Sequence, residues 1–157
     1  MSMVDVFVSF DVDHDEELYE QLVEESTAMT SSFAVSGSSE RLMNTDVSRE
    51  AARCRIRDAD QVIVICGEHT GVSTRMSTEL RLAQEEQTPY LLLWGRRDVM
   101  CTKPMGAKSD EGMYSWTPQI LQDQIATVHR KSLADAATEA ARAARKARSN
   151  PSGASGS

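Results

Sequence analysis

Four short apolar segments, each followed by an amphipathic one, set the pattern of this chain. The apolar segments are rich in β-branched, aromatic or leucine residues, which is typical of buried strands. We predict strands over residues 4–10, 33–35, 61–66 and 90–94. The third, QVIVIC, is apolar at every position after the first, as expected of a central parallel strand that helices cover on both faces.

Helices are predicted between and after these strands, because apolar residues recur there three or four positions apart. The predicted helices cover residues 14–29, 46–58, 73–86 and a segment that begins with Thr117 as cap and Pro118 as first residue. Their apolar faces are, in the same order, Leu18, Leu22 and Met29; Val47, Ala51 and Cys54; Met76, Leu80 and Ala83; and Ile120, Leu121, Ile125 and Val128.

The alternation of strands and helices predicts a single α/β domain over residues 1–130. We expect a flavodoxin-like parallel sheet of four to five strands with helices on both faces. The Ala-rich tract 131–148 predicts a helical extension, and the Pro/Gly/Ser-rich segment 149–157 predicts a disordered tail. Ligands of such sheets bind outside the carboxyl ends of the strands, so the residues that follow each strand are the candidates for a site.

Charge is distributed unevenly along the 157 residues, whose formal net charge is −7. Residues 1–40 hold ten acidic and no basic side chains, whereas the remainder holds 14 acids and 17 bases. This acidic first part argues against nucleic-acid binding. No apolar run is long enough to span a bilayer and no signal peptide begins the chain, so we expect a cytoplasmic protein without a membrane partner.

Several metal and nucleophile patterns are weak. Cys54, Cys66 and Cys101 are widely spaced and predict neither a disulfide framework nor a zinc site. The acidic series Asp11-x-Asp13-x-Asp15 suggests a metal or a phospho-acceptor, but a receiver domain needs an Asp where Cys66 stands. Acids that charge and cap the start of a helix are the simpler interpretation. The glycines form no phosphate-binding loop, and no GxSxG motif is present.

Glu79 is the most informative polar residue. It lies about two turns into the helix that Ser73 is expected to cap, on the inward edge beside Leu80. A carboxylate there, near the carboxyl ends of the strands, is partly desolvated and is a candidate for function. The alternative is a structural ion pair with Arg75, one helical turn earlier.

Two segments resemble Toll/interleukin-1 receptor (TIR) domains. VDVFVSFDVDHD resembles their first strand, and DADQVIVICGEHTGVSTRMSTEL resembles their third strand, loop and following helix. The second is similar to the branch that includes Thoeris anti-phage defence effectors, with the pattern H-T-x-x-S-x-aromatic-V-x-x-E-I. His69, Thr70, Ser73 and Glu79 match it in register, while Arg75 stands at the aromatic position. The resemblance covers roughly residues 3–129.

The resemblance implies an NAD nucleosidase or cyclase, a hydrolase-type enzyme that breaks the nicotinamide–ribose bond of NAD and yields ADP-ribose or a cyclic signal nucleotide. Glu79 would be the catalytic residue, with NAD as substrate and neither a metal nor a further cofactor. It also implies antiviral defence signalling, homotypic TIR self-association and a downstream effector that senses the product. The expected substrate-binding residues are Phe10, Asp11, Ser36, Ser38, His69, Ser73 and Trp94.

Two other functions remain open from the sequence. A non-enzymatic TIR scaffold would signal by association alone, and Arg75 is its main support. A nucleoside deoxyribosyltransferase uses a similar sheet and also places a Glu at an anomeric carbon. If molecules associate head to tail, the acids of residues 1–40 and the bases of the Ala-rich helix are the candidate surfaces to meet.

Overall fold

A five-stranded, fully parallel sheet forms the centre of the protein. The computed structural model describes residues 3–41 and 45–149. The strand order is β2-β1-β3-β4-β5. The first strand, β1, therefore lies inside the sheet, with β2 on one side and β3, β4 and β5 on the other. The strands are β1 (Val4–Ser9), β2 (Phe33–Ser38), β3 (Gln61–Cys66), β4 (Tyr90–Trp94) and β5 (Met113–Ser115).

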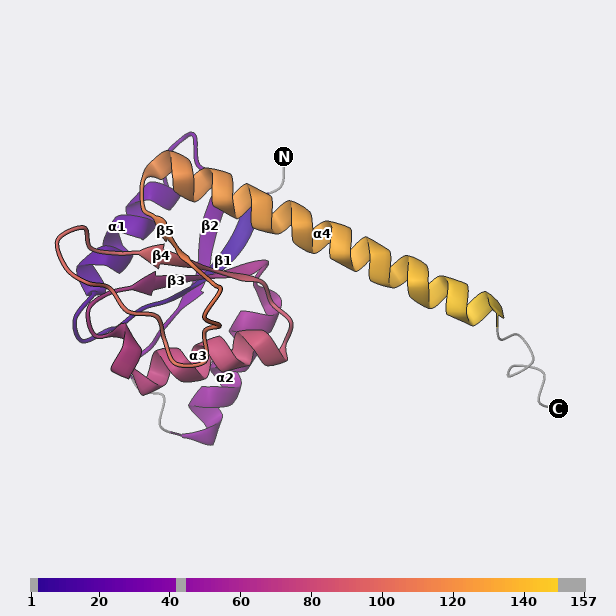
Figure 1. Cartoon of the computed structure of the whole chain (residues 1–157), viewed down its shortest axis with the longest axis horizontal. Coiled ribbons are helices and arrows are strands. Elements are labelled where there is room, and N and C mark those ends of the chain that lie inside the picture. Colours follow the sequence, from indigo (N-terminus) through magenta and orange to yellow (C-terminus); the bar gives the residue numbers. More distant parts are fainter. Residues whose placement is uncertain (1–2, 42–44, 150–157) are drawn as a thin grey trace.

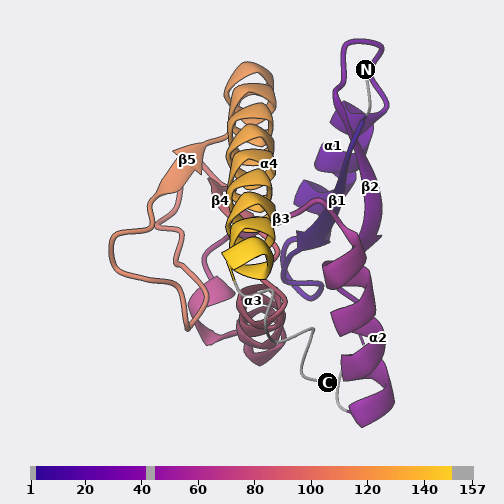
Figure 2. The same ribbon diagram turned by 90° about the vertical axis from the view of Figure 1, so that its right-hand side faces the viewer.

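Helices cover both faces of this sheet, as predicted (Figure 1, Figure 2). On one face, α1 and α4 bury residues such as Leu22 and Ile125 against β1, β3 and β4. On the other face, α2 and α3 bury residues such as Ile56 and Met76. The helices are α1 (Glu16–Ser26), α2 (Asp46–Asp58), α3 (Thr74–Glu85) and α4 (Pro118–Ser149), with a short 3-10 turn, η1 (Thr70–Val72), before α3.

The central elements match the sequence pattern closely, because an unbroken apolar run or a capping side chain defines where they begin and end. All six residues of β3 are buried, which agrees with its unbroken apolar run. Thr45 caps α2 in a capping box with Ser48. The hydroxyl of Ser73 accepts from the backbone N–H of Met76 at 3.2 Å, so Ser73 is the N-cap of α3, as predicted.

The peripheral elements differ from prediction. The helix expected over 14–29 ends at Ser26, and Met29 is exposed outside it. Strand β2 extends to Ser38, with a bulge at Ser36 where the register with β1 shifts. A fifth strand, β5, ends the long connection that follows β4. Val47, Ala51 and Cys54 do share one face of α2, but that face is turned away from the core, where Ala52 and Ile56 pack.

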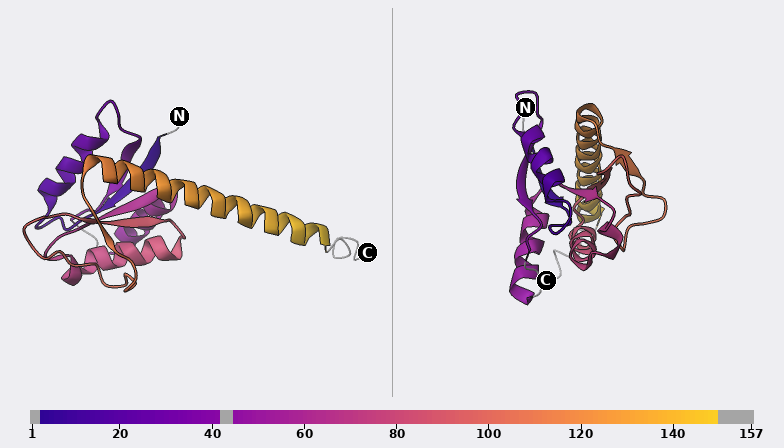
Figure 3. Two further views of the ribbon diagram at one scale, coloured as in Figure 1. Left: turned by 45° about the horizontal axis from the view of Figure 1, so that its top comes forward. Right: turned by 90° about the vertical axis from the view of Figure 1, so that its left-hand side faces the viewer.

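One helix, α4, contains both the last predicted domain helix and the Ala-rich extension. Its first turns pack Leu121 and Ile125 into the core, whereas residues 133–148 are all exposed. This second part extends away from the sheet, as Figure 1 and the left view of Figure 3 show. The tail predicted over 149–157 lies outside the described residues beyond the backbone of Ser149.

Two further expectations concern membranes and disulfides. In the described ranges, no helix combines the length and apolarity needed to cross a bilayer. All three cysteines are free thiols, and burial raises the pKa of the Cys66 thiol to about 12.

The turn after β4 gives a test of the packing. A Cβ at Gly95 would lie 2.8 Å from the carbonyl oxygen of Cys66 and 2.9 Å from Leu18 Cδ1, whereas Gly112 has no atom within 4 Å of such a Cβ. We expect Gly95→Ala to lower the free energy of unfolding by about 1–3 kcal/mol, because the backbone must shift. Urea unfolding measures this, with Gly112→Ala as the matched control. Equal stability of the two variants would contradict the packing described.

Candidate active site

The carboxylate of Glu79 is fully buried at the carboxyl end of the sheet, with 0% of the residue exposed. Two serine hydroxyls donate to the same oxygen, Oε1: Ser9 Oγ at 2.7 Å and Ser39 Oγ at 2.6 Å. The second oxygen, Oε2, is buried and has no hydrogen-bond partner. The Glu79 carboxylate therefore has one satisfied and one unsatisfied oxygen in an apolar surrounding.

Three separate elements converge on this carboxylate. Glu79 lies on α3, beside the buried Met76 and Leu80. Ser9 is the last residue of β1, on the sheet face that α3 covers. Ser39 directly follows β2 and also accepts from the backbone N–H of Phe10 at 3.0 Å. Because parallel strands end at one edge, β1 and β2 bring both hydroxyls to the inward face of the helix.

Burial dominates the electrostatics of Glu79 and raises its pKa from an ordinary value of 4.5 to about 7. The hydrogen bonds from Ser39 and Ser9 and the charge of Arg75 lower the pKa but do not compensate for desolvation. Among the described side chains, no ion pair within 4 Å joins Arg75 to Glu79. Instead, Arg75 Nη2 donates to the carbonyl oxygen of Arg41. The Arg75–Glu79 ion pair considered from the sequence is therefore not the main interaction of Glu79, whose carboxylate accepts from Ser9 and Ser39.

The segment from Ser39 to Arg41 adjoins this carboxylate through Ser39 and is held at several points. The backbone N–H of Ser39 donates to the carbonyl oxygen of Val8 at 2.9 Å. Glu40 pairs with Arg55 at 2.6 Å, and Arg41 pairs with Asp13 at 3.2 Å. These contacts hold Ser39 at the fully buried Glu79 carboxylate.

A second polar group lies after β1 and β3. Asp11 Oδ1 accepts from the backbone N–H of Asp13 at 3.0 Å, and Asp11 Oδ2 lies 2.9 Å from His14 Nδ1. The His14 ring stacks on that of His69, with 3.9 Å between ring centroids. The hydrogen bond with Asp11 raises the pKa of His14. The predicted site residues Asp11 and His69 are thus linked through His14, which is not among the predicted site residues.

Asp15 departs from the expected role of a helix-capping acid. It occupies the N-cap position of α1 but makes no side-chain capping bond. Its buried carboxylate accepts instead from Arg96 Nε at 3.2 Å and Arg96 Nη2 at 3.0 Å. Desolvation raises the pKa of Asp15, and the pairing with Arg96 opposes that shift. Within the described ranges, no three His, Cys, Asp or Glu side chains are placed to hold a metal ion.

The other predicted substrate-binding residues make contacts of their own, and the side-chain hydrogen bonds of the described Glu79 carboxylate come from Ser9 and Ser39 instead. The Phe10 ring is buried and stacks on Tyr19, with 4.6 Å between centroids. Ser36 Oγ donates to the carbonyl oxygen of Val6 at 3.2 Å, and Ser38 pairs with Val8 in the sheet. Trp94 Nε1 donates to the carbonyl oxygen of Arg96 at 2.5 Å.

The site residues that sequence reasoning missed are Ser9 and Ser39. A strand that alternates sides turns Phe7 and Ser9 to the same face, so a serine at that position is a polar interruption of a buried surface. That interruption was the available signal for Ser9. Ser39 carried no comparable signal, because serines and a glycine surround it in the sequence.

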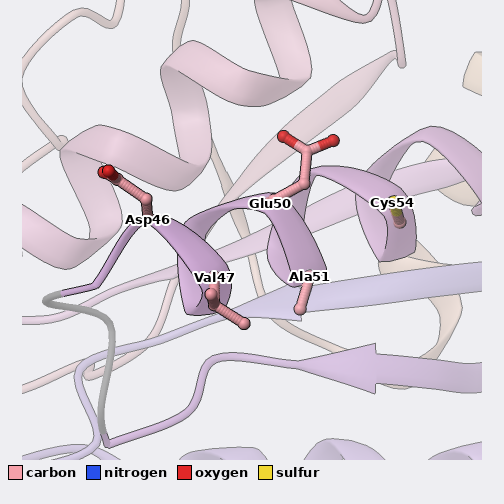
Figure 4. Close-up of a pocket in the computed structure, with 5 residues that line it drawn as sticks. All are labelled: Asp46, Val47, Glu50, Ala51 and Cys54. Carbon is pink, nitrogen blue, oxygen red and sulfur yellow. The ribbon is translucent and has the colours of Figure 1, made fainter.

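A shallow cavity of about 400 Å³ lies apart from Glu79, on the outer face of α2 (Figure 4). Val47, Ala51 and Cys54 give it an apolar lining, and Asp46 and Glu50 are its charged residues. In the view of Figure 4, the carboxylates of Asp46 and Glu50 point away from the Val47 and Ala51 side chains. The apolar face of α2 that was predicted to pack in the core therefore lines this surface cavity instead.

The sheet order, the helices on both faces and the C-terminal helix define a TIR-like α/β fold. A crystal structure of a prokaryotic SEFIR domain is similar to this chain, with a TM-score of 0.52 and 19% sequence identity. The similarity covers 81% of this chain and 90% of the SEFIR domain, and at this identity it concerns the fold alone. No protein-family model and no curated protein matches the chain.

The raised pKa of Glu79 predicts a specific pH dependence of stability. Its native pKa of about 7 exceeds the ordinary 4.5, so the folded state holds the proton more tightly. The cost of burying the charge is therefore absent below about pH 4.5, grows as the pH rises, and is complete above about pH 7. At about 1.4 kcal/mol per pKa unit, that cost is about 3 kcal/mol.

We expect Glu79→Gln to gain thermal stability relative to the parent as the pH is raised from 5 to 8. About 2.5 kcal/mol of the cost develops between pH 5 and 8, which corresponds to roughly 5–10 °C in Tm for a chain of this size. Comparing the two proteins at each pH cancels the titration of Asp15 and Glu25, whose pKa values are also raised. Glu85→Gln, on the exposed end of α3, is the matched control. A Tm difference that does not change with pH would contradict the burial of Glu79.

Proposed function

We propose that this TIR-like domain cleaves the bond between nicotinamide and ribose in NAD, as a glycohydrolase or as an ADP-ribose cyclase, with Glu79 as the catalytic residue. The observation that carries this proposal is the buried Glu79 carboxylate, whose Oε2 has no partner. A fold does not need such a group, since an apolar residue of similar size would avoid the desolvation cost. A buried carboxylate with a strongly raised pKa is typical of a functional site.

The two serines suggest how a ribose would be held. Ser9 and Ser39 donate hydroxyl groups to Glu79 Oε1 at 2.6–2.7 Å. The ribose of NAD carries two adjacent hydroxyls of the same chemistry, which can replace one or both serine donors. Because Glu79 is fully covered, Ser39 must move before a substrate reaches it. Binding of the sugar would then exchange hydrogen bonds rather than break them without replacement.

The chemical step needs only a carboxylate near the sugar. The bond from C1′ of the ribose to the nicotinamide nitrogen breaks, and its electron pair leaves with nicotinamide, which becomes neutral. The positive charge moves to the ribose as an oxocarbenium-like species, which ionised Glu79 stabilises in a site of low dielectric. Water then attacks C1′ and releases a proton, or an adenine nitrogen of the same molecule attacks C1′ and closes a ring.

The closed cover over Glu79 favours a second candidate, a non-enzymatic scaffold. Arg75 donates to the carbonyl oxygen of Arg41, and Ser39 and Glu40 are also held. In a scaffold this covered carboxylate would only organise the end of the sheet. The nucleoside deoxyribosyltransferase alternative has no such observation in its favour.

The proposal includes the setting in which the enzyme acts. We place it in the cytoplasm, in anti-phage signalling of the Thoeris type, as a domain that becomes active when copies assemble. A downstream effector would sense the ADP-ribose product. Assembly is a natural trigger, because neighbouring copies can displace the segment that covers Glu79.

Incubation of the concentrated or crowded protein with NAD tests the activity. We expect nicotinamide release by the parent, and a loss of about 100-fold or more in Glu79→Gln, because the variant cannot carry the charge that opposes the oxocarbenium. Glu85→Gln removes an exposed carboxylate from the same helix and is expected to leave the rate unchanged. Equal background release by the parent and Glu79→Gln under assembling conditions would rule out the enzyme and leave the scaffold.

The pH profile of nicotinamide release gives a separate test. The reaction needs ionised Glu79, so we expect the rate to fall as the pH decreases through about 7. Ser39→Ala removes a hydrogen bond that lowers the pKa of Glu79, so the acidic limb of its profile should move to higher pH. A limb at the same pH in both proteins would mean that another group controls the rate.

A further inference from the structure

Arg75 is a charged residue whose contacts account for only part of its side chain. It lies on α3, one helical turn before Glu79, and is half-buried. Its Nη2 atom donates to the carbonyl oxygen of Arg41. Its Nε atom is buried and has no hydrogen-bond partner among the described residues. A buried N–H donor without an acceptor is destabilising, so the fold alone gives no reason for this one.

A complementary atom lies on the next turn of the same helix. Glu79 Oε2 is an acceptor that is likewise buried and without a partner in the described chain. Residues four apart lie on the same side of a helix. Burial raises the pKa of Glu79, and the charge of Arg75 is one of the effects that lower it, so the guanidinium acts on this carboxylate. Helix α3 therefore presents one unused donor and one unused acceptor, which do not satisfy each other.

Both side chains contact the same short segment after β2. Ser39 Oγ donates to Glu79 Oε1 at 2.6 Å, and the carbonyl oxygen of Arg41 accepts from Arg75 Nη2. This segment thus uses one atom of each α3 side chain and leaves Arg75 Nε and Glu79 Oε2. Because Ser39 must move before a substrate reaches Glu79, the same movement gives access to both unused atoms.

A single hydroxyl group has the chemistry that these two atoms lack. It accepts one hydrogen bond at its oxygen and donates another through its hydrogen. An ammonium group has no acceptor and an ionised phosphate oxygen has no donor, so neither can serve both atoms. Two hydrogen bonds of about 2.8 Å that meet at one oxygen hold their outer atoms roughly 4.5 Å apart. Two side chains that share a hydroxyl are therefore not bonded directly to each other, as is the case here.

We propose that Arg75 is a substrate-binding residue that holds, together with Glu79 Oε2, one hydroxyl of the nicotinamide ribose of NAD. This inference rests on the proposed function and adds to it a residue and a selectivity. Arg75 Nε–H donates to the hydroxyl oxygen, and the hydroxyl donates to Glu79 Oε2. A sugar without that hydroxyl would leave a buried donor and a buried acceptor unpaired, so the site discriminates against it.

Steady-state kinetics of Arg75→Lys test the role of the Nε–H group. Lysine keeps the positive charge but carries its donors only at the end of the chain. We expect KM for NAD to rise about tenfold with a smaller change in kcat, because a charge-assisted hydrogen bond to the sugar is lost. Arg81→Lys is the matched control, since Arg81 is exposed on the same helix and pairs with Glu85, and its KM should equal that of the parent.

NAD analogues that lack the 2′- or the 3′-hydroxyl of the nicotinamide ribose identify the bound group. In the parent alone, we expect one analogue to have a KM about tenfold above that of NAD. On that analogue, the parent and Arg75→Lys should agree within about twofold, because the partner of Nε is already absent. The other analogue should keep the difference between the two proteins. Arg75→Met, which removes every donor, should behave like Arg75→Lys.

Binding separates this proposal from the proposed activity. The Kd of NAD, measured by calorimetry before turnover, should be about tenfold weaker in Arg75→Lys whether or not the nicotinamide–ribose bond is cleaved. Cleavage with equal KM and Kd in both proteins would overturn the role of Arg75 and leave the activity standing. Parent KM values that are equal for NAD and both analogues would also overturn it. Absence of both binding and cleavage under assembling conditions would overturn the two proposals together.

Discussion

The desolvation of one carboxylate constrains the whole carboxyl end of this sheet. Glu79 is buried where α3 meets β1, and its pKa of about 7 measures how poorly the interior solvates its charge. The end of β1 must supply a hydroxyl, and β2 must continue far enough to place Ser39 beside it. The order β2-β1-β3 makes this possible, because it puts both serines at neighbouring strand ends.

The fold was predictable where the apolar pattern agrees with the residues that end or cap an element. Strand β3 and helix α2 have the predicted ends, since QVIVIC is followed by a glycine and α2 follows a capping threonine. The edge strands were less predictable. Strand β2 continues through Ser36 and Gly37, and β5 has only three residues, two of them exposed. Strands β2 and β5 are defined by their hydrogen bonds to a neighbouring strand. Those bonds cannot be predicted from local propensity or from apolar periodicity.

The site was predictable in its centre and not in its surroundings. Glu79 stood out because a charge on an inward helix edge is anomalous, whereas Ser9 and Ser39 are common residues whose role depends on the pairing of distant strands. The face of α2 shows the opposite error. Val47, Ala51 and Cys54 are correctly spaced, but Ala52 and Ile56, one helical turn apart, form the face of α2 that is buried in the core.

Because α4 is one continuous helix, the orientation of its exposed second part depends on the packing of its first turns against the sheet. Because a helix turns 100° per residue, the direction in which Leu133 faces relative to the sheet is fixed by the number of residues between Ile125 and Leu133. One residue added there would rotate the exposed part of the helix by about 100° without touching the core, and seven would restore it to within about 20°. The helix is therefore an angular spacer between the domain that holds Glu79 and residues 133–148.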